Sequence, residues 1–159
     1  MNQGNEANRT GSLLEKQVEV VFTSLGFHIK ASSEDRGTMD LLEDRVLVKD
    51  APYLTVYGTT GRSEFLAHDY LLGLSVRIEC KWQGVPGSVD EKFPYIFMNA
   101  TDTMKENEIV IILGGNGAKS AAKRWLKDAA KSSKVPQGKT IHVFSLEEFT
   151  DWAGKRFIR

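Results

Sequence analysis

The sequence predicts an α/β protein in which helices flank a mixed central sheet. Segments with the alternating apolar and polar residues of strands are interspersed with segments that have the amphipathic spacing of helices. Their order along the chain is helix, several strands, helix, strand, helix, strand, helix, which is typical of one sheet between helices. No repeat or shift in composition divides the chain, so we expect one domain over residues 11–159.

The composition is that of an ordinary globular domain. The chain has 159 residues, of which 41% are apolar and 26% charged. The chain has 21 basic residues (Lys and Arg) and 21 acidic residues (Asp and Glu), so its net charge does not indicate a nucleic-acid partner. A basic surface would have to come from local clustering of Lys and Arg. Cys80 is the single cysteine, which excludes an intrachain disulfide, and the three histidines do not have zinc-ligand spacing.

The beginning of the chain predicts an arm followed by a helix. Residues 1–10 are rich in Asn, Gly and Glu, and we expect a flexible arm there without the apolar stretch of a signal peptide. Ser12 and Glu15 have the spacing of a capping box before a helix over residues 13–25, which Gly26 ends. No apolar run is long enough to span a membrane, so we expect a cytoplasmic protein.

Strands are predicted in the middle of the chain. Residues 64–72 and 74–82 flank Gly73, and residues 76–81 alternate between apolar and charged types, so we expect an antiparallel pair. Further strands are expected over residues 45–48, 53–57, 108–113 and 140–144.

Three more helices are expected. Ser88 with Glu91 and Ser145 with Glu148 repeat the capping-box spacing, which predicts helices that start near residues 89 and 146. A third helix is expected over residues 118–132, after a glycine-rich turn.

Charged residues on the expected strand pair form a candidate site. Side chains two residues apart on a strand share a face, so Glu79 and Lys81 point the same way. A turn near Gly73 can bring Asp69 beside Glu79, with Glu64 as a rival acidic residue. Two carboxylates with open positions suit Mg²⁺ or Mn²⁺, and a neighbouring lysine can orient a water molecule. These are the ingredients of phosphodiester hydrolysis.

The order Asp69…Glu79-Cys80-Lys81 resembles the signature of the PD-(D/E)xK nuclease superfamily, with His68 at the position of the proline. The resemblance implies a restriction-endonuclease-like fold. It also implies that Asp69, Glu79 and the carbonyl of Cys80 are metal ligands and that Lys81 is the catalytic lysine. The run of residues 87–92 resembles a segment that follows the lysine in some members.

Two further residues match the family pattern. Many members place a glutamate of the first helix near the metal, and Glu15 corresponds to it. Gln83 extends the motif to E-x-K-x-Q. The alternatives are a helix-capping role for Glu15 and a polar strand end at Gln83.

Basic residues after the glycine-rich run of residues 114–117 are candidates for contact with nucleic acid. Lys119, Lys123 and Lys127 recur every four residues and form a stripe opposite the apolar helix face. The stripe is either a solvated helix face or a contact to the DNA backbone, and Arg62 is a further candidate. Residues 114–120 are not a phosphate loop, because no Gly-Lys-Ser/Thr triplet ends the run.

The leading hypothesis is a Mg²⁺- or Mn²⁺-dependent DNA endonuclease. It is either a junction-resolving or structure-selective enzyme, for which a homodimer is expected, or a small restriction-like enzyme. The alternative is a catalytically silent module for nucleic-acid binding or protein interaction on the same fold. The choice between DNA and RNA and the sequence specificity stay open.

Overall fold

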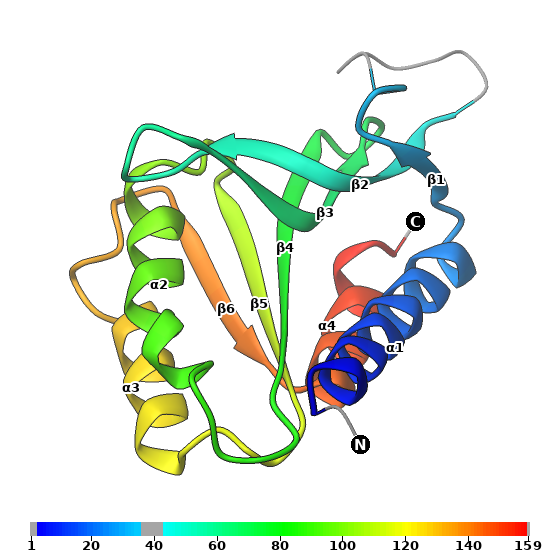
Figure 1. The fold of residues 1–159 in the computed structure, drawn as a ribbon. Helices are drawn as coiled ribbons and strands as arrows, with labels where there is room; N and C mark the ends of the chain where they lie inside the picture. The colour runs from blue at the N-terminus through cyan, green and yellow to red at the C-terminus, as the bar shows by residue number, and fades with distance from the viewer. Residues whose placement is uncertain (1–2, 36–42, 159) are drawn as a thin grey trace.

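Six strands form one mixed sheet between two pairs of helices (Figure 1). The computed structural model describes residues 3–35 and 43–158. The strands lie in chain order across the sheet: β1 (His28–Ala31), β2 (Arg45–Leu54), β3 (Thr60–Asp69), β4 (Leu74–Trp82), β5 (Glu108–Gly114) and β6 (Thr140–Phe144). Strands β2, β3 and β4 are antiparallel, whereas β1 pairs with β2, β4 with β5 and β5 with β6 in parallel. The predicted fold class is confirmed.

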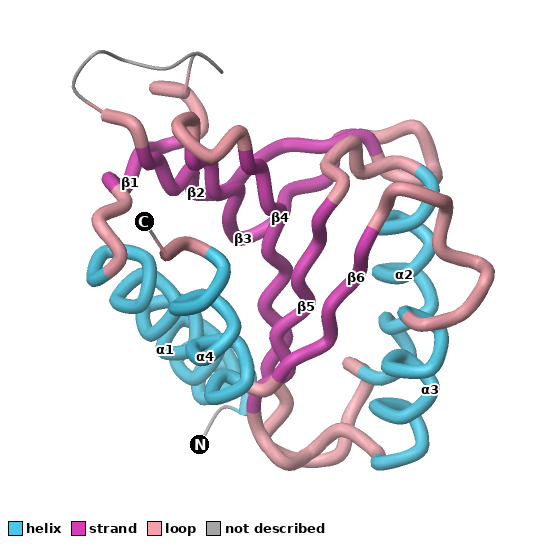
Figure 2. The backbone as a smooth tube through the Cα atoms, turned by 180° about the vertical axis from the view of Figure 1, so that it is seen from behind, coloured by secondary structure: helices cyan, strands magenta, loops and turns pink. Residues whose placement is uncertain are grey.

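Each face of the sheet has its own helix pair and its own core (Figure 2). One face is covered by α1 (Gln3–Ser24) and α4 (Leu146–Arg156), and the other by α2 (Phe93–Asp102) and α3 (Ser120–Ala130), with a short 3₁₀ helix η1 (Asp90–Lys92) before α2. On the first face the fully buried ring of Phe22 lies 5.7 Å from that of Phe149 and 5.8 Å from that of Phe157. No helix within residues 3–35 and 43–158 has the length and apolar character to cross a bilayer.

Helix α1 is longer than predicted. It begins at Gln3, so residues 3–10 of the expected arm are helical, while residues 1–2 lie outside the described part. Ser12 is therefore inside the helix, and the predicted capping box with Glu15 is wrong. No proline interrupts residues 3–24, and the exposed Ser12 is tolerated because propensity at a solvent-facing position is a weak constraint.

Two other boundaries differ from the prediction. Strand β2 is continuous through Pro52, because β1 pairs only with residues 46–49 and leaves that part of β2 a free edge. Helix α2 begins at Phe93, without a side-chain cap, so the predicted capping box of Ser88 and Glu91 is wrong. Pro94 lies in the first turn of α2, where its missing N–H is not needed.

The capping box at the start of α4 is confirmed. The hydroxyl of Ser145 accepts a hydrogen bond from the N–H of Glu148 at 3.1 Å, and the carboxylate of Glu148 accepts one from the N–H of Ser145 at 2.7 Å. Strand β1 was not predicted, because its four residues are mostly exposed and have no apolar alternation that marks a buried strand.

Candidate active site

The sheet splits between β3 and β4. The two strands pair from Asp69 and Leu74 up to Phe65 and Ile78. Beyond that point β3 pairs only with β2, and the end of β4 pairs only with β5, so the two strands run apart (Figure 1). A fork of this kind leaves backbone N–H and C=O groups without ladder partners between the two strands.

Three charged side chains meet in the fork. The ammonium nitrogen of Lys81 lies 2.9 Å from Glu79 Oε2 and 3.2 Å from Glu64 Oε1. The other carboxylate oxygen of Glu64 accepts a hydrogen bond from the backbone N–H of Cys80 at 2.8 Å. Glu79 and Lys81 therefore share a face of β4, as predicted, and their acidic neighbour on β3 is Glu64.

Asp69 does not lie beside Glu79. It pairs with Leu74 at the far end of the hairpin, and its buried carboxylate accepts a hydrogen bond from Arg45 Nε at 2.7 Å. Arg45 also donates to the carbonyls of Leu25 and Phe157, both at 2.6 Å. The expected meeting of Asp69 and Glu79 is therefore wrong: Asp69 is held by Arg45, which also contacts the end of α1 and the C-terminal segment.

His68 also lies away from the fork. Its ring stacks on that of Tyr70, and its Nδ1 lies 2.8 Å from the hydroxyl of Ser75. Burial lowers the pKa of His68. These contacts belong to the turn end of the hairpin, so the structure gives His68 no place beside Lys81.

Burial and charge act against each other on Glu79. The carboxyl is 3% exposed, and burial raises its pKa to about 7, although the ammonium of Lys81 opposes this rise. Burial lowers the pKa of Lys81, but the carboxylates of Glu79 and Glu64 outweigh burial and raise that pKa above its ordinary value. Lys81 is therefore a cation at neutral pH, whereas burial works against the charged form of Glu79.

Glu15 lies near this cluster without a direct contact among the described hydrogen bonds. It is half-buried on α1, and burial, followed by the negative charges of Glu64 and Asp50, raises its pKa. The charge of Lys81 lowers the same pKa. The structure therefore brings Glu15 within electrostatic range of the fork, on the helix where the family pattern places a glutamate.

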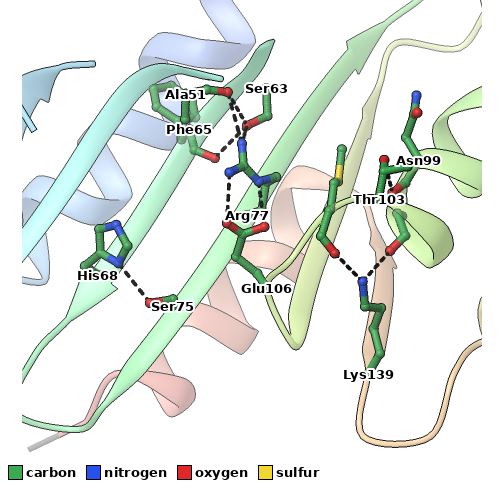
Figure 3. A network of polar contacts seen from close by, with 12 residues as sticks. Ala51, Ser63, Phe65, His68, Ser75, Arg77, Asn99, Thr103, Glu106 and Lys139 are labelled. Atoms are coloured by element: carbon green, nitrogen blue, oxygen red, sulfur yellow. Dashed lines mark hydrogen bonds and ion pairs between the residues drawn. The ribbon is translucent and has the colours of Figure 1, made fainter. Parts of the chain in front are cut away.

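A buried arginine, Arg77, makes a network of polar contacts near the fork (Figure 3). Arg77, on the same face of β4 as Glu79, donates to both carboxylate oxygens of Glu106, at 2.7 and 2.8 Å. It also donates to the carbonyl of Ala51 at 3.0 Å and to the hydroxyl of Ser63 at 2.9 Å. Arg77 therefore ties β2 and β3 to the segment before β5.

Gln83 is buried and its amide is used within the fold. Its Oε1 accepts a hydrogen bond from the N–H of Val89 at 2.9 Å, and its Nε2 donates to the carbonyl of Gly117 at 3.4 Å. A Cβ at Gly115 would lie 2.2 Å from the carbonyl oxygen of Gln83, and one at Gly117 would lie 2.3 Å from that of Val85. The glycine-rich run thus serves close packing of two loops, and Gln83 positions the chain after Lys81.

A cavity of about 360 Å³ opens beside Glu79 and Lys81. Its walls are the β2–β3 hairpin, residues 79–82 of β4 and the start of α2. Arg62 and Lys92 are exposed cations on these walls. The cavity therefore combines the buried carboxylate of Glu79 with exposed cations on its walls, and it includes Arg62, which was predicted as a contact to nucleic acid.

The predicted basic stripe of α3 does not line this cavity. Lys119 and Lys127 are exposed and Lys123 is half-buried. Lys127 lines a different cavity, of about 320 Å³, between α3 and β6. A role of these lysines in nucleic-acid binding stays a prediction.

The donors in the fork fit a hard divalent cation. The carboxylates of Glu64 and Glu79 already contact one shared cation, the ammonium of Lys81, and carboxylate and carbonyl oxygens are the ligands that Mg²⁺ and Mn²⁺ prefer. Within the described residues no three side chains of His, Cys, Asp or Glu gather closely enough to hold an ion. The carbonyl of Cys80 and water molecules would complete the set.

The sequence contains a signal for Glu64 that the prediction ranked second. Asp69 pairs with Leu74, and Glu79 lies five residues after Leu74. Counting the same distance back from Asp69 reaches Glu64. A turn over residues 70–73 would therefore have selected Glu64, whereas the prediction placed the turn near Gly73 and chose Asp69.

Comparison with known proteins supports the family resemblance. A family model described as a PD-(D/E)XK nuclease superfamily domain matches residues 6–157, which is nearly the whole chain. A comparison with curated proteins gave no match.

Proposed function

The chain belongs to the PD-(D/E)XK nuclease superfamily, and on that premise we propose that it is a metal-dependent endonuclease that hydrolyses DNA. The observation that carries the proposal is the contact of Lys81 with both Glu64 and Glu79 in the fork of the sheet. Two acidic groups and a lysine on neighbouring strands are the groups that such a hydrolysis requires.

We propose Glu64, Glu79 and the carbonyl of Cys80 as ligands of Mg²⁺ or Mn²⁺. The bound ion supplies positive charge to the scissile phosphate and lowers the pKa of a bound water. Glu15 is proposed as a further acidic group on the α1 side. Asp69 is left out of this set because it pairs with Arg45.

Lys81 acts as a hydrogen-bond donor. Its raised pKa keeps it an ammonium, which can hold a water molecule or a phosphate oxygen at the end of β4. Glu79 must lose its proton to bind a cation, and its pKa of about 7 makes that loss sensitive to pH near neutrality. Gln83 and the glycine-rich loop hold the end of β4 in place.

The proposed partner is DNA, bound through its phosphates. Arg62 and Lys92 lie on the cavity walls, and Lys119, Lys123 and Lys127 form a separate basic stripe at α3. A junction-resolving enzyme would work as a homodimer, since two symmetric cuts need two sites. A cytoplasmic location also stays a prediction.

The test is cleavage by the purified chain of three substrates: linear duplex DNA, single-stranded DNA and a four-way junction. Each is incubated with Mg²⁺, with Mn²⁺ or with EDTA. We expect cutting only with a divalent ion, and at least about a 100-fold lower rate for Lys81→Ala and Glu79→Gln, because each removes a group that stabilises the transition state. Lys105→Ala, which changes an exposed lysine outside the cavity lining, is the matched control and should cut like the parent.

Parent-like cutting by Lys81→Ala would overturn the proposal. Binding of nucleic acid that is insensitive to metal and to Glu79→Gln, without cutting, would support the silent binding module instead. Light scattering with and without the junction tests the homodimer.

A further inference from the structure

Two tyrosines from distant parts of the chain stack beside the cavity. Tyr57 lies in the turn between β2 and β3, and Tyr95 lies in the first turns of α2. Their ring centroids are 5.2 Å apart and their planes differ by 20°. This is a stacked aromatic pair whose two members come from the β2–β3 hairpin and from α2.

The pair presents an uncovered aromatic ring to solvent. Tyr57 is 76% exposed, whereas Tyr95 is half-buried and lines the cavity. The outer ring therefore contributes little to the core, and tyrosine side chains are enriched at interfaces.

The turn that carries Tyr57 is held firmly. The N–H of Val56 donates to the buried Oδ1 of Asn99 on α2 at 2.9 Å. Within the turn, the N–H of Thr55 donates to the carbonyl of Thr59 and the N–H of Gly58 donates to the carbonyl of Thr55, both at 2.9 Å. A ring on such a turn is presented with little loss of conformational entropy when a ligand binds.

Cations and the proposed catalytic groups lie on the same side. Tyr95 shares the cavity walls with Lys81, Arg62 and Lys92. An aromatic ring next to cations is the combination that binds single-stranded nucleic acid, because bases stack on the ring while the cations contact phosphates. Bases within an intact duplex are already stacked on one another and are not available to Tyr57.

We propose that Tyr57 and Tyr95 form a stacking platform for an unpaired nucleobase next to the scissile phosphate. This rests on the proposed nuclease function and narrows its substrate to nucleic acid with an unpaired segment: a single strand, a frayed end or a branch point. The base stacks on the exposed face of Tyr57, as a third ring on the pair.

The test is binding of a single-stranded oligonucleotide that contains 2-aminopurine, in EDTA so that no strand is cut. The matched ligand is a blunt duplex of the same sequence. We expect the parent to quench the 2-aminopurine and to bind the single strand more tightly than the duplex. Tyr57→Ala should raise the Kd for the single strand about 5- to 150-fold and leave that for the duplex unchanged. Tyr57→Phe keeps a ring and should bind like the parent.

Tyr70→Ala is the control for loss of a stacked tyrosine. Tyr70 stacks on His68 at the far end of β3, with centroids 5.4 Å apart, and should not affect the Kd. If the parent cuts DNA but Tyr57→Ala binds and cuts single strands as the parent does, the platform is overturned and the proposed function stands. If the parent cuts no nucleic acid with either metal, the proposed function fails on its own test, while the binding comparison still judges the platform. If Tyr57→Ala raised the Kd for the single strand and for the duplex by the same factor, the stacking platform would also be overturned.

Discussion

Glu64 Oε2 accepts a hydrogen bond from the backbone N–H of Cys80 at 2.8 Å. A side chain thus takes the place of the backbone ladder at the point where β3 and β4 separate. The contact directs the second oxygen of Glu64 to the ammonium of Lys81, at 3.2 Å. The divergence of two strands and the gathering of the charged groups are therefore one structural feature.

The buried carboxyl of Glu79 makes stability depend on pH. Its folded pKa of about 7 lies above the ordinary value of 4.5, so the folded state binds the extra proton and stability falls as pH rises between the two values. Without metal, Glu79→Gln should be more stable than the parent at pH 8, by roughly 1–3 kcal/mol, and should lose this pH dependence. Urea unfolding at pH 5 and pH 8 measures both effects.

The control for Glu79→Gln is Glu91→Gln, at an exposed position of η1, which should keep the parent's pH profile. A Glu79→Gln protein that is less stable than the parent at pH 8 would show that the carboxylate is well accommodated and would contradict the raised pKa.

Arg77 and Glu106 form a largely buried ion pair that links β4 to the segment before β5. Burial raises the pKa of Glu106, but the hydrogen bonds and charge of Arg77 outweigh it and lower the pKa below its ordinary value. The ion pair therefore stabilises the folded state fully when the pH is above the ordinary pKa of a glutamate carboxyl. This contribution is lost as the pH falls through the lowered pKa of Glu106. Arg77→Met should cost about 3 kcal/mol at pH 7, because it leaves Glu106 buried without its partner.

The double variant Arg77→Met with Glu106→Gln should recover part of that loss, since no charge is left unpaired. Chemical unfolding of the parent, both single variants and the double variant gives the coupling energy. If the losses in the free energy of unfolding of the two single variants simply added in the double variant, the pairing of Arg77 with Glu106 would be contradicted.

The glycine-rich loop should not tolerate a side chain at residue 117. The Cβ of Gly117→Ala would lie 2.3 Å from the carbonyl oxygen of Val85, and we expect a loss of about 1–3 kcal/mol in the free energy of unfolding. Gly154→Ala, in α4, meets no atom within 4 Å and should gain about 0.5–1 kcal/mol from helix propensity. The Tm should therefore fall for Gly117→Ala and rise for Gly154→Ala. Equal shifts of Tm in the two variants would contradict close packing of the loop at Gly117.

The basic stripe of α3 predicts a salt effect. If Lys119 and Lys123 each contact a DNA phosphate, each change to alanine should reduce the slope of log K against log salt by about 0.9. Lys155→Ala, an exposed change on the opposite helix layer, should leave the slope unchanged. Titrations at several salt concentrations measure it, and an unaltered slope in the α3 variants would mean that the stripe is a solvated helix face.

The strands that regular patterns mark were predictable from the sequence. The bounds of β4 and β6 match the expected ranges, because alternation and β-branched residues mark strands directly. Glu79 and Lys81 were found for the same reason. Asp69 was misplaced because a hairpin register depends on where the turn lies, and a shift of a few residues changes every partner.

The buried pair of Arg45 and Asp69 was out of reach of local patterns. Arg45 joins Asp69 to the carbonyls of Leu25 and Phe157, so with Arg45 itself the network combines four separate segments of the chain. Only the assembled fold shows that this carboxylate is already occupied. The stacking of Tyr57 on Tyr95 was hidden in the same way, since it joins a hairpin turn to a helix.

The most direct measurement compares Glu64→Gln with Asp69→Asn in Mg²⁺-dependent cleavage, with rates expressed per folded molecule. The account predicts that Glu64→Gln cuts at least about 100-fold more slowly than the parent, whereas Asp69→Asn is less stable but cuts at the parent's rate. Parent-like cutting by Glu64→Gln, together with loss of cutting by a folded Asp69→Asn, would contradict it.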